Sequence, residues 1–388
     1  MHDVVIVGAG PVGGALALAL ADADLDVVAL DARAAGAAPR GDRSLALSHG
    51  ARLIFERLAV WPRLAAVTGA VTPIVEIDIS QAGGFGVTRL VALEQGVPAL
   101  GYVVSYRALQ AAIDDALAHT GIEVRYGAAA ASVIGTPAHA DVALTDGGAT
   151  PLQARLAVVA DGSGTSIAGI AREKRDYGQL ALIAKVGMDR PHRGVAFERF
   201  TPEGPMALLP EGEHPNEHYG LVWTMTPTKA EAMLALADAP FLAAVAHHFG
   251  RRVSGFARVH DRRTFPLRLE FARPAVATRS VVIGNAAQAL HPIAGQGFNL
   301  GVRDAYELGQ AIIRAPRDAL GTRAMLAGFA AQRRTDRYAG IAFTHGLTQL
   351  FALDSPLLRW PRGLALTALD ALPPVKKAFT RAMLFGLS

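Results

Sequence analysis

The residues best placed to do chemistry lie between positions 284 and 300, in the run GNAAQALHPIAGQGFNL. A short apolar stretch, residues 280–283, precedes this run and is predicted to be a strand, and a helix is predicted to begin near Asn299. A strand, a glycine turn and the free N–H groups of a helix N-terminus together can hold an anionic group. The run therefore predicts a cofactor-binding loop. Its candidate binding residues are Gly284, Asn285, Gly295, Gly297 and Asn299.

A second glycine motif, GAGPVG at 8–13, follows a predicted strand over residues 3–7 and precedes an apolar helix. In such a motif Gly8 allows the tight turn, Gly10 lets the backbone approach a pyrophosphate, and Gly13 permits close helix–strand contact. A further predicted strand ends at Asp31, about 20 residues on, where the motif places a carboxylate that accepts hydrogen bonds from ribose hydroxyls. The context predicts a dinucleotide-binding βαβ unit.

A third predicted strand, residues 156–160, ends in Asp161 and Gly162. The Asp-Gly pair is common in ordinary turns, so it indicates little by itself. Because it lies between the other two motifs in the chain, we interpret it as a third cofactor loop, with Asp161 as a binding residue.

Three motifs in this order resemble the FAD-dependent aromatic hydroxylases of the para-hydroxybenzoate hydroxylase type. The amino-acid sequence of residues 284–301 is most similar to that of the ubiquinone-biosynthesis branch of this family, in particular to the 2-octaprenyl-6-methoxyphenol hydroxylases. The similarity extends to the ERFT run at 198–201 and the TFPL run at 264–267. The chain departs from the broader family at three positions: Asn285 replaces an Asp, Gln288 replaces a His, and Ala168 replaces an Arg.

The resemblance implies FAD as the cofactor and NADPH or NADH as a transient electron donor. It also implies that reduced FAD and O2 form a C4a-hydroperoxide, which hydroxylates the ring of a polyprenylated phenol. Water must be excluded from such a site, or the reactive species is lost.

Two arginines match positions that contact flavin in the family. Arg43 lies in the GDRSLALS run, and Arg107 opens a predicted helix after Ser105 and Tyr106. His291 lies in the glycine loop, where a flavin or substrate contact and a loop-bracing hydrogen bond are equally compatible with the sequence. The chain has no Ser-His-Asp or paired-carboxylate pattern, so no catalytic residue is assigned.

Two other functions remain compatible with the motifs. One is an FAD-dependent reductase or oxidase acting on another apolar substrate. The other is a non-catalytic flavoprotein subunit of a biosynthetic complex. Consumption of O2 driven by NADH or NADPH, with a hydroxylated product, would distinguish ring hydroxylation from these two functions.

The order of predicted elements indicates an α/β fold with a discontinuous, Rossmann-like FAD-binding domain. A mostly antiparallel substrate-binding sheet is inserted into it, and a helical segment ends the chain. The predicted limits are 1–70, 99–175 and 276–315 for the FAD-binding domain, 71–98 and 176–275 for the substrate domain, and 316–388 for the helical region.

Composition narrows the function classes. The 388 residues include no Cys, which excludes disulfides and thiolate catalysis, and the 12 His are scattered, so no metal site is expected. A net charge of +4 is too small to favour nucleic acid as a partner. Residues 4–21 carry no charge, but the glycine motif explains this run better than a membrane span does.

The C-terminal segment predicts a location. From residue 359 onward, five basic side chains and one Asp are interleaved with apolar residues, as in a helix that lies in a membrane interface. The alternative is a helix packed on its own domain. We expect a cytoplasmic protein that binds the inner face of the cytoplasmic membrane peripherally, with biosynthetic complex partners as a further possibility.

Overall fold

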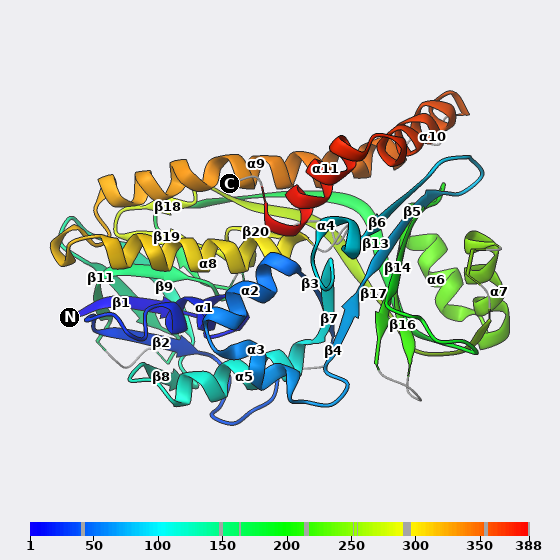
Figure 1. Ribbon diagram of the computed structural model, residues 1–388. Helices are drawn as coiled ribbons and strands as arrows, with labels where there is room; N and C mark the ends of the chain where they lie inside the picture. The colour runs from blue at the N-terminus through cyan, green and yellow to red at the C-terminus, as the bar shows by residue number, and fades with distance from the viewer. Residues whose placement is uncertain are drawn as a thin grey trace.

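The computed structural model describes residues 1–39, 43–146, 150–162, 164–212, 217–250, 252–253, 255–289, 296–352 and 356–386. Within these residues the strands form sheets of nine, eight and three strands. Figure 1 shows the two large sheets at opposite ends of the molecule, the small sheet between them, and the C-terminal helices along one side. The predicted α/β fold with a second, inserted sheet is confirmed.

The nine-stranded sheet contains a parallel core in the order β19-β11-β1-β2-β8. Its central strand β1 reads as a continuous apolar run because both of its faces are covered, as is typical of parallel sheets. The strands of this sheet are β1 (His2–Val7), β2 (Val27–Asp31), β8 (Glu123–Tyr126), β9 (Ala130–Gly135), β10 (Ala140–Leu144), β11 (Leu152–Val159), β12 (Ser166–Ile167), β18 (Val276–Ala277) and β19 (Ser280–Val282).

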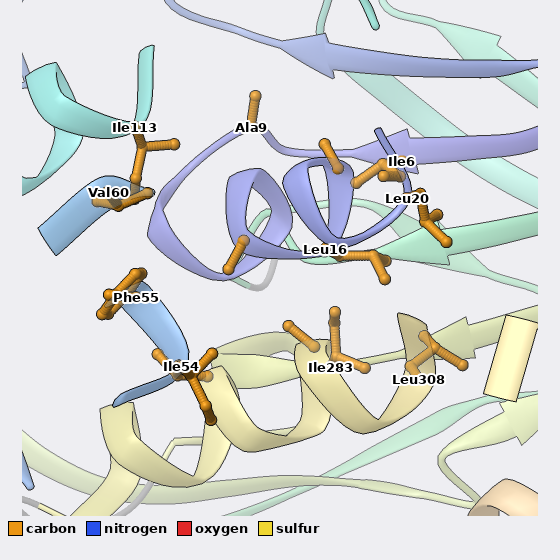
Figure 2. Close-up of a cluster of buried hydrophobic side chains, with 14 of the residues drawn as sticks. Ile6, Ala9, Leu16, Leu20, Ile54, Phe55, Val60, Ile113, Ile283 and Leu308 are labelled. Carbon is orange, nitrogen blue, oxygen red and sulfur yellow. The ribbon is translucent and has the colours of Figure 1, made fainter. Parts of the chain in front are cut away.

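Helices α1 (Pro11–Ala19), α5 (Tyr106–Ala118) and α8 (Gln296–Arg314) contribute to the core on one face of this sheet. Figure 2 shows Ile6, Leu16 and Leu308 turned toward one another, and none of the three has any exposed surface. Burying such a side chain stabilises the fold by roughly 1.5–3 kcal/mol. This core holds the first glycine loop and the start of α8 in one rigid unit.

The three-stranded sheet has the order β3-β7-β4, with β3 (Ser44–Ser48), β7 (Gly101–Ser105) and β4 (Val71–Ile74). Helices α2 (His49–Arg57) and α3 (Val60–Ala65) follow β3 in the chain. The side chain of Ser48 accepts a hydrogen bond from Ala51 N and so caps α2. This small sheet connects the nucleotide sheet to the substrate sheet.

The eight-stranded sheet has the order β20-β17-β13-β16-β15-β14-β5-β6 and is mostly antiparallel. Helices α6 (Pro227–Ala235) and α7 (Asp238–Phe249) cover one face, where Met206 and Trp223 have no exposed surface. Its strands are β5 (Glu76–Gln81), β6 (Val87–Val91), β13 (Ala171–Met188), β14 (Val195–Phe200), β15 (Pro205–Glu211), β16 (His218–Met225), β17 (Phe256–Arg273) and β20 (Gln288–Ala289); the short helix α4 (Ala92–Gln95) follows β6.

The C-terminal region is helical, as predicted, with α9 (Arg323–Ala352), α10 (Pro356–Ala371) and α11 (Pro373–Phe385). Short 3-10 turns, η1 (Gly284–Ala286) and η3 (Arg317–Ala319), flank α8. Among the described residues, no helix is both long enough and apolar enough to cross a bilayer.

Two strands do not follow the predicted domain limits. Strand β4 lies within the stretch 71–98 assigned to the substrate sheet, yet it pairs with β7 in the small sheet. Strand β13 begins at Ala171 and continues through the predicted limit at 175/176, because its long pairing with β17 forms a ribbon between the two large sheets. The domain limits therefore stay a prediction.

Candidate functional site

The first glycine loop packs directly against the third motif. Gly8 has a φ of +96°, and a Cβ added to it would lie 2.7 Å from the Cα atom of Asp161. A Cβ on Gly13 would lie 1.8 Å from the carbonyl oxygen of Gly8. Only glycine allows these approaches, so the two loops meet backbone to backbone.

Gly10 differs from its two neighbours in the motif. It caps α1 with a φ of −64°, and a Cβ added there would meet no atom within 4 Å. Its side of the loop is open, beside a helix N-terminus that no side chain caps. Open space next to free N–H groups fits a pyrophosphate, as the sequence motif predicts.

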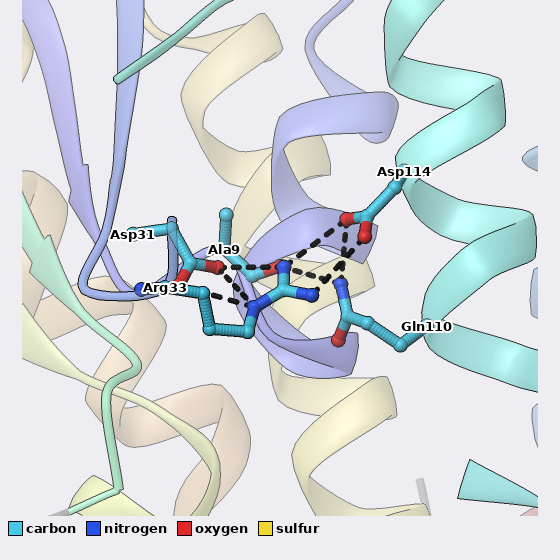
Figure 3. Close-up of polar contacts among 5 residues, drawn as sticks. All are labelled: Ala9, Asp31, Arg33, Gln110 and Asp114. Atoms are coloured by element: carbon cyan, nitrogen blue, oxygen red, sulfur yellow. Dashed lines mark hydrogen bonds and ion pairs between the residues drawn. The ribbon is translucent and has the colours of Figure 1, made fainter. Parts of the chain in front are cut away.

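The carboxylate of Asp31 is already engaged (Figure 3). Asp31 is 5% exposed and accepts hydrogen bonds from the backbone N of Arg33 at 2.8 Å and from its Nη2 at 2.8 Å. The guanidinium of Arg33 also bonds Asp114 on α5, with Nη1 3.1 Å from Oδ2. Burial alone would lower the pKa of Arg33, but its bonds to Asp31 and Asp114 outweigh that effect and raise it.

Gln110 completes this network. Its Nε2 donates to the carbonyl oxygen of Ala9 at 3.0 Å and to Asp114 Oδ1 at 2.8 Å. The end of β2, the glycine loop and α5 are thus tied together. Arg33, Gln110 and Asp114 were missed, because the motif specifies no protein partner for its acidic residue and because Gln110 and Asp114 lie far from it in the chain. A ribose hydroxyl would have to share Asp31 with Arg33, so its role in ribose binding stays a prediction.

Asp161 closes its own turn. Its Oδ2 accepts hydrogen bonds from Thr165 N at 2.9 Å and Thr165 Oγ1 at 2.7 Å, and Gly162 has a φ of +93°. The side chain therefore shapes the loop that meets Gly8. A direct cofactor contact by Asp161 stays a prediction.

The predicted flavin loop lies against the first motif. Gly284 has a φ of +62°, and a Cβ on Gly301 would lie 2.9 Å from Gly284 Cα, so α8 and the loop approach closely. Asn285 is exposed and Gly297 is half-buried. Gly295 and His291 lie outside the described residues.

Asn299 is buried and holds the start of α8 to the small sheet. Its Oδ1 accepts from Ser48 N at 2.8 Å, and its Nδ2 donates to Ala46 O at 3.0 Å. The side chain positions the N-terminus of α8, and the first backbone N–H groups of a helix, which have no partner within the helix, can bind an anion. Contact between Asn299 and flavin stays a prediction.

Arg43 and Arg107 lie together where β3 begins and β7 ends. Both side chains are exposed, and the guanidinium of Arg43 stands 4.7 Å from the centre of the Tyr106 ring. The backbone N of Tyr106 donates to Arg43 O at 2.9 Å. The structure thus brings together two arginines that the resemblance pointed to, and their contact with flavin stays a prediction.

Gln288, at a position where the family has His, belongs to a buried charge network between β20 and α9. Its Oε1 accepts from Arg337 Nε at 2.9 Å, and its Nε2 donates to Asp304 Oδ2 at 3.4 Å. Arg333 is 1% exposed and bonds Asp304 and Asp336, each at 2.8 Å. The network fastens α8 to α9, and sequence reasoning gave no sign of it, because its members are up to 49 residues apart.

One carboxyl on the substrate sheet was also missed as a candidate. Glu198 lies in the middle of β14, and burial raises its pKa to about 8. The sequence offered only the ERFT run, in which nothing marks the Glu as desolvated.

Comparison with known proteins agrees with this geometry. Residues 1–337 match the family described as FAD binding domain. The chain is 33% identical to ubiquinone hydroxylase UbiL of Rhodospirillum rubrum, over 98% of this chain and 88% of that protein. It is 28% identical to the 3-demethoxyubiquinol 3-hydroxylase of Escherichia coli, over 97% and 96% of the two chains.

Solved structures share the fold. The p-nitrophenol 4-monooxygenase PnpA of Pseudomonas putida superposes with a TM-score of 0.76 at 16% identity, over 99% of this chain and 97% of that one. PqsL of Pseudomonas aeruginosa, in complex with 2-aminobenzoylacetate, gives a TM-score of 0.74 at 21% identity, over 95% and 99%. With a family match over most of its length and an open cradle at Gly10 that fits a pyrophosphate, the chain belongs to the FAD-binding domain family and is an FAD-dependent monooxygenase.

Proposed function

We propose that this protein hydroxylates the aromatic ring of a polyprenylated phenol in ubiquinone biosynthesis, with O2 as co-substrate and NADPH or NADH as electron donor. The observation that carries the proposal is the near full-length similarity to proteins named as hydroxylases of ubiquinone or its precursors. Bound FAD would supply the redox chemistry that activates O2.

The residues of this chain would bind and orient that cofactor. The open cradle at Gly10 would take the pyrophosphate, and Asn299 would hold the N-terminus of α8 in place. A helix N-terminus stabilises nearby negative charge, such as that of reduced flavin, by roughly 1 kcal/mol. The substrate sheet would cover the reacting atoms and exclude water.

An exposed apolar patch supports peripheral binding to the membrane that holds the polyprenyl substrate. We call it the α10 patch; it consists of Phe85, Trp360 and Leu364, all exposed. Trp360 is 69% exposed, and its ring centre lies 5.0 Å from that of Phe85 on the β5–β6 hairpin. Figure 1 places the hairpin and α10 together at one extremity of the molecule. Exposed aromatic and aliphatic side chains of this kind insert into a bilayer interface.

Of the five basic side chains from residue 359 onward, Lys376 is not placed to face a membrane. It is 8% exposed, and its Nζ lies 3.1 Å from carboxylate oxygens of Glu94 and of Asp370. Helix α11 is therefore packed on the fold on this side, with Thr380 and Leu384 buried. The apolar side chains of the α10 patch, more than these charges, would contact the membrane.

The test is deletion of the gene followed by mass spectrometry of the quinone precursors. A precursor that lacks one ring hydroxyl should accumulate, and the wild-type gene should restore quinone synthesis. The Gly10→Val variant serves as a control that cannot bind FAD. If this variant restores synthesis as well as wild type does, a non-catalytic role in a complex replaces the proposal. If the accumulating compound needs reduction or dehydrogenation instead, the enzyme is a reductase or oxidase.

A further inference from the structure

Glu198 stands on the face of the substrate sheet opposite to α6 and α7. Side chains alternate along a strand, and residues paired across strands point to the same side. Phe197 and Arg199, its neighbours in β14, face α7: Phe197 packs on the core there, and Arg199 Nε donates to His248 O at 2.8 Å. Glu198 therefore points to the other face.

The register shows what surrounds it. Glu198 pairs with Ile79 on β5 and with Ala207 on β15, and the same row continues to Val222 and Ile183. All five residues of this row keep some accessible surface. On the other face, Met206 and Trp223 keep none. The face that carries Glu198 is thus an apolar surface that the described residues only partly cover.

The same face looks toward the flavin side of the molecule. Ala196, two residues before Glu198, is buried against Val103 of β7 and Ile74 of β4. Strand β7 pairs with β3, and β3 is bonded to Asn299 at the start of α8. Glu198 therefore borders the region between the substrate sheet and the helix N-terminus assigned to flavin.

The carboxyl of Glu198 lies among apolar side chains. Glu198 keeps some accessible surface, yet burial raises its pKa to about 8, and burial is the only cause. Its direct neighbours across the strands, Ile79 and Ala207, are apolar and offer the carboxylate no hydrogen bond, so the side chains around it desolvate it. Among the described residues, no ion pair or hydrogen bond compensates this carboxyl.

We infer that Glu198 is a catalytic residue that hydrogen-bonds the hydroxyl of the phenol substrate and takes its proton during ring hydroxylation. This inference rests on the proposed function. A carboxyl that no described residue pairs, among apolar side chains beside the flavin region, is suited to a single polar group on an otherwise apolar substrate. A buried polar group persists where a ligand completes its hydrogen bonds.

The proton and electron changes balance. The phenol O–H bond breaks and its proton goes to a Glu198 oxygen, while the electron pair moves into the ring. An ortho or para ring carbon forms a bond to one oxygen atom of O2; the O–O bond breaks, and the other oxygen leaves as water. The ring C–H proton is then lost, and Glu198 returns its proton to the phenol oxygen. NADPH or NADH supplies the two electrons with one hydrogen, and the solvent supplies one proton; together with the ring proton, these complete the new hydroxyl and the water.

The ionised form of Glu198 is the active base, so hydroxylation should increase with pH toward about 8 and then level off. Other ionisable side chains lie on the same face of the described sheet, but toward its other strands and ends. These are Lys185, Glu211, His218, His260, Arg258 and Arg263. Helices α10 and α11 pack on the β5–β6 edge of this face and carry Arg362, Asp370 and Lys376, and Lys376 is paired with Asp370 and Glu94. Glu211 pairs with His218 at 3.0 Å, and burial alone accounts for the raised pKa of Glu198.

The experiment uses the FAD-loaded enzyme, NADH or NADPH, and a phenol with a short prenyl tail. Glu198→Gln should keep FAD binding but lower hydroxylation by roughly 100- to 10,000-fold, the usual contribution of a general base. The substitution should also abolish the increase of the hydroxylation rate with pH, and a larger share of the NADH or NADPH consumed should yield hydrogen peroxide. Glu231→Gln, an exposed residue on α6, is the matched control and should change none of these quantities.

The methyl ether of the same phenol separates a chemical role from a structural one. It has no hydroxyl proton, so wild type and Glu198→Gln should be equally poor with it. If Glu198→Gln hydroxylates the free phenol at the wild-type rate with the same pH profile, the inference is wrong. If wild type itself hydroxylates no prenylated phenol while it oxidises NADH or NADPH, the proposed function fails instead.

Discussion

The contrast between Gly8 and Gly10 gives the sharpest test of the cofactor cradle. In Gly10→Val the new side chain enters open space, since a Cβ there meets no atom within 4 Å and φ is −64°. Valine is a poorer helix N-cap than glycine, which costs about 1 kcal/mol. The variant should fold, but its side chain would occupy the space assigned to the pyrophosphate, so FAD binding should be lost.

Gly8→Ala should fail for a different reason. The left-handed φ of +96° costs an alanine roughly 1–2 kcal/mol. Its Cβ would lie 2.7 Å from Asp161 Cα, an overlap with backbone that cannot move without shifting the third loop, at roughly 1–3 kcal/mol more. The free energy of unfolding should fall by roughly 2–5 kcal/mol even without FAD.

The assay compares both variants as apoproteins and after incubation with FAD. Urea unfolding gives the free energy of unfolding, and absorbance of the bound flavin after gel filtration gives the stoichiometry. Gly10→Val should unfold nearly like wild type and remain colourless. Should Gly10→Val retain FAD at wild-type occupancy, the pyrophosphate has been assigned to the wrong loop.

The remaining predictions concern other parts of the molecule. Asp31→Ala should weaken FAD binding and lower stability, since it removes a charged partner worth roughly 1.5–3 kcal/mol and leaves Arg33 with Asp114 alone; equal FAD affinity in titrations of wild type and variant would contradict this. The double variant Trp360→Ser, Phe85→Ser should co-sediment less with vesicles than wild type does. Val67 is exposed outside the α10 patch, so Val67→Ser should not change co-sedimentation. Vesicle binding that depends only on salt concentration would rule out apolar insertion. Lys376→Glu should lower thermal stability, because it places a third carboxylate beside Glu94 and Asp370, and an unchanged Tm would argue against the packed position of α11. The pKa of Glu198 is raised from 4.5 to about 8 in the folded state. The protonated carboxyl therefore contributes fully to the stability of the fold below pH 4.5, and this contribution is lost as the pH rises to 8. The free energy of unfolding of Glu198→Gln, relative to that of wild type, should therefore rise between pH 5 and pH 8 by about 1–3 kcal/mol, after allowance for partial exposure. Urea unfolding at both pH values measures this difference, and an equal difference at the two pH values would contradict the prediction.

The sequence by itself determined the nucleotide-binding fold and its cofactor class. Glycine at 8, 10 and 13 is a local requirement, since each position limits what one backbone turn can do. Apolar runs such as residues 3–7 identify buried parallel strands, and the order of the three motifs identifies the family. These signals depend on residues close together in the chain, so no tertiary structure was needed to read them.

Only the tertiary structure decided which side chains are occupied by protein partners. Asp31 is bound by Arg33, Asn299 joins α8 to β3, and Gln288 belongs to a network with Arg337. The last two contacts join segments far apart in the chain. Their partners are not visible in any local pattern.

The same limit explains Glu198 and Lys376. A Glu in a strand is ordinarily solvated, and what raises the pKa of this one is desolvation by burial in the folded protein. A Lys on an amphipathic helix is ordinarily a surface charge, whereas Lys376 is paired with Glu94, 282 residues away. Burial and pairing depend on how the elements pack, so the sequence supplied the residue types and the fold decided their environment.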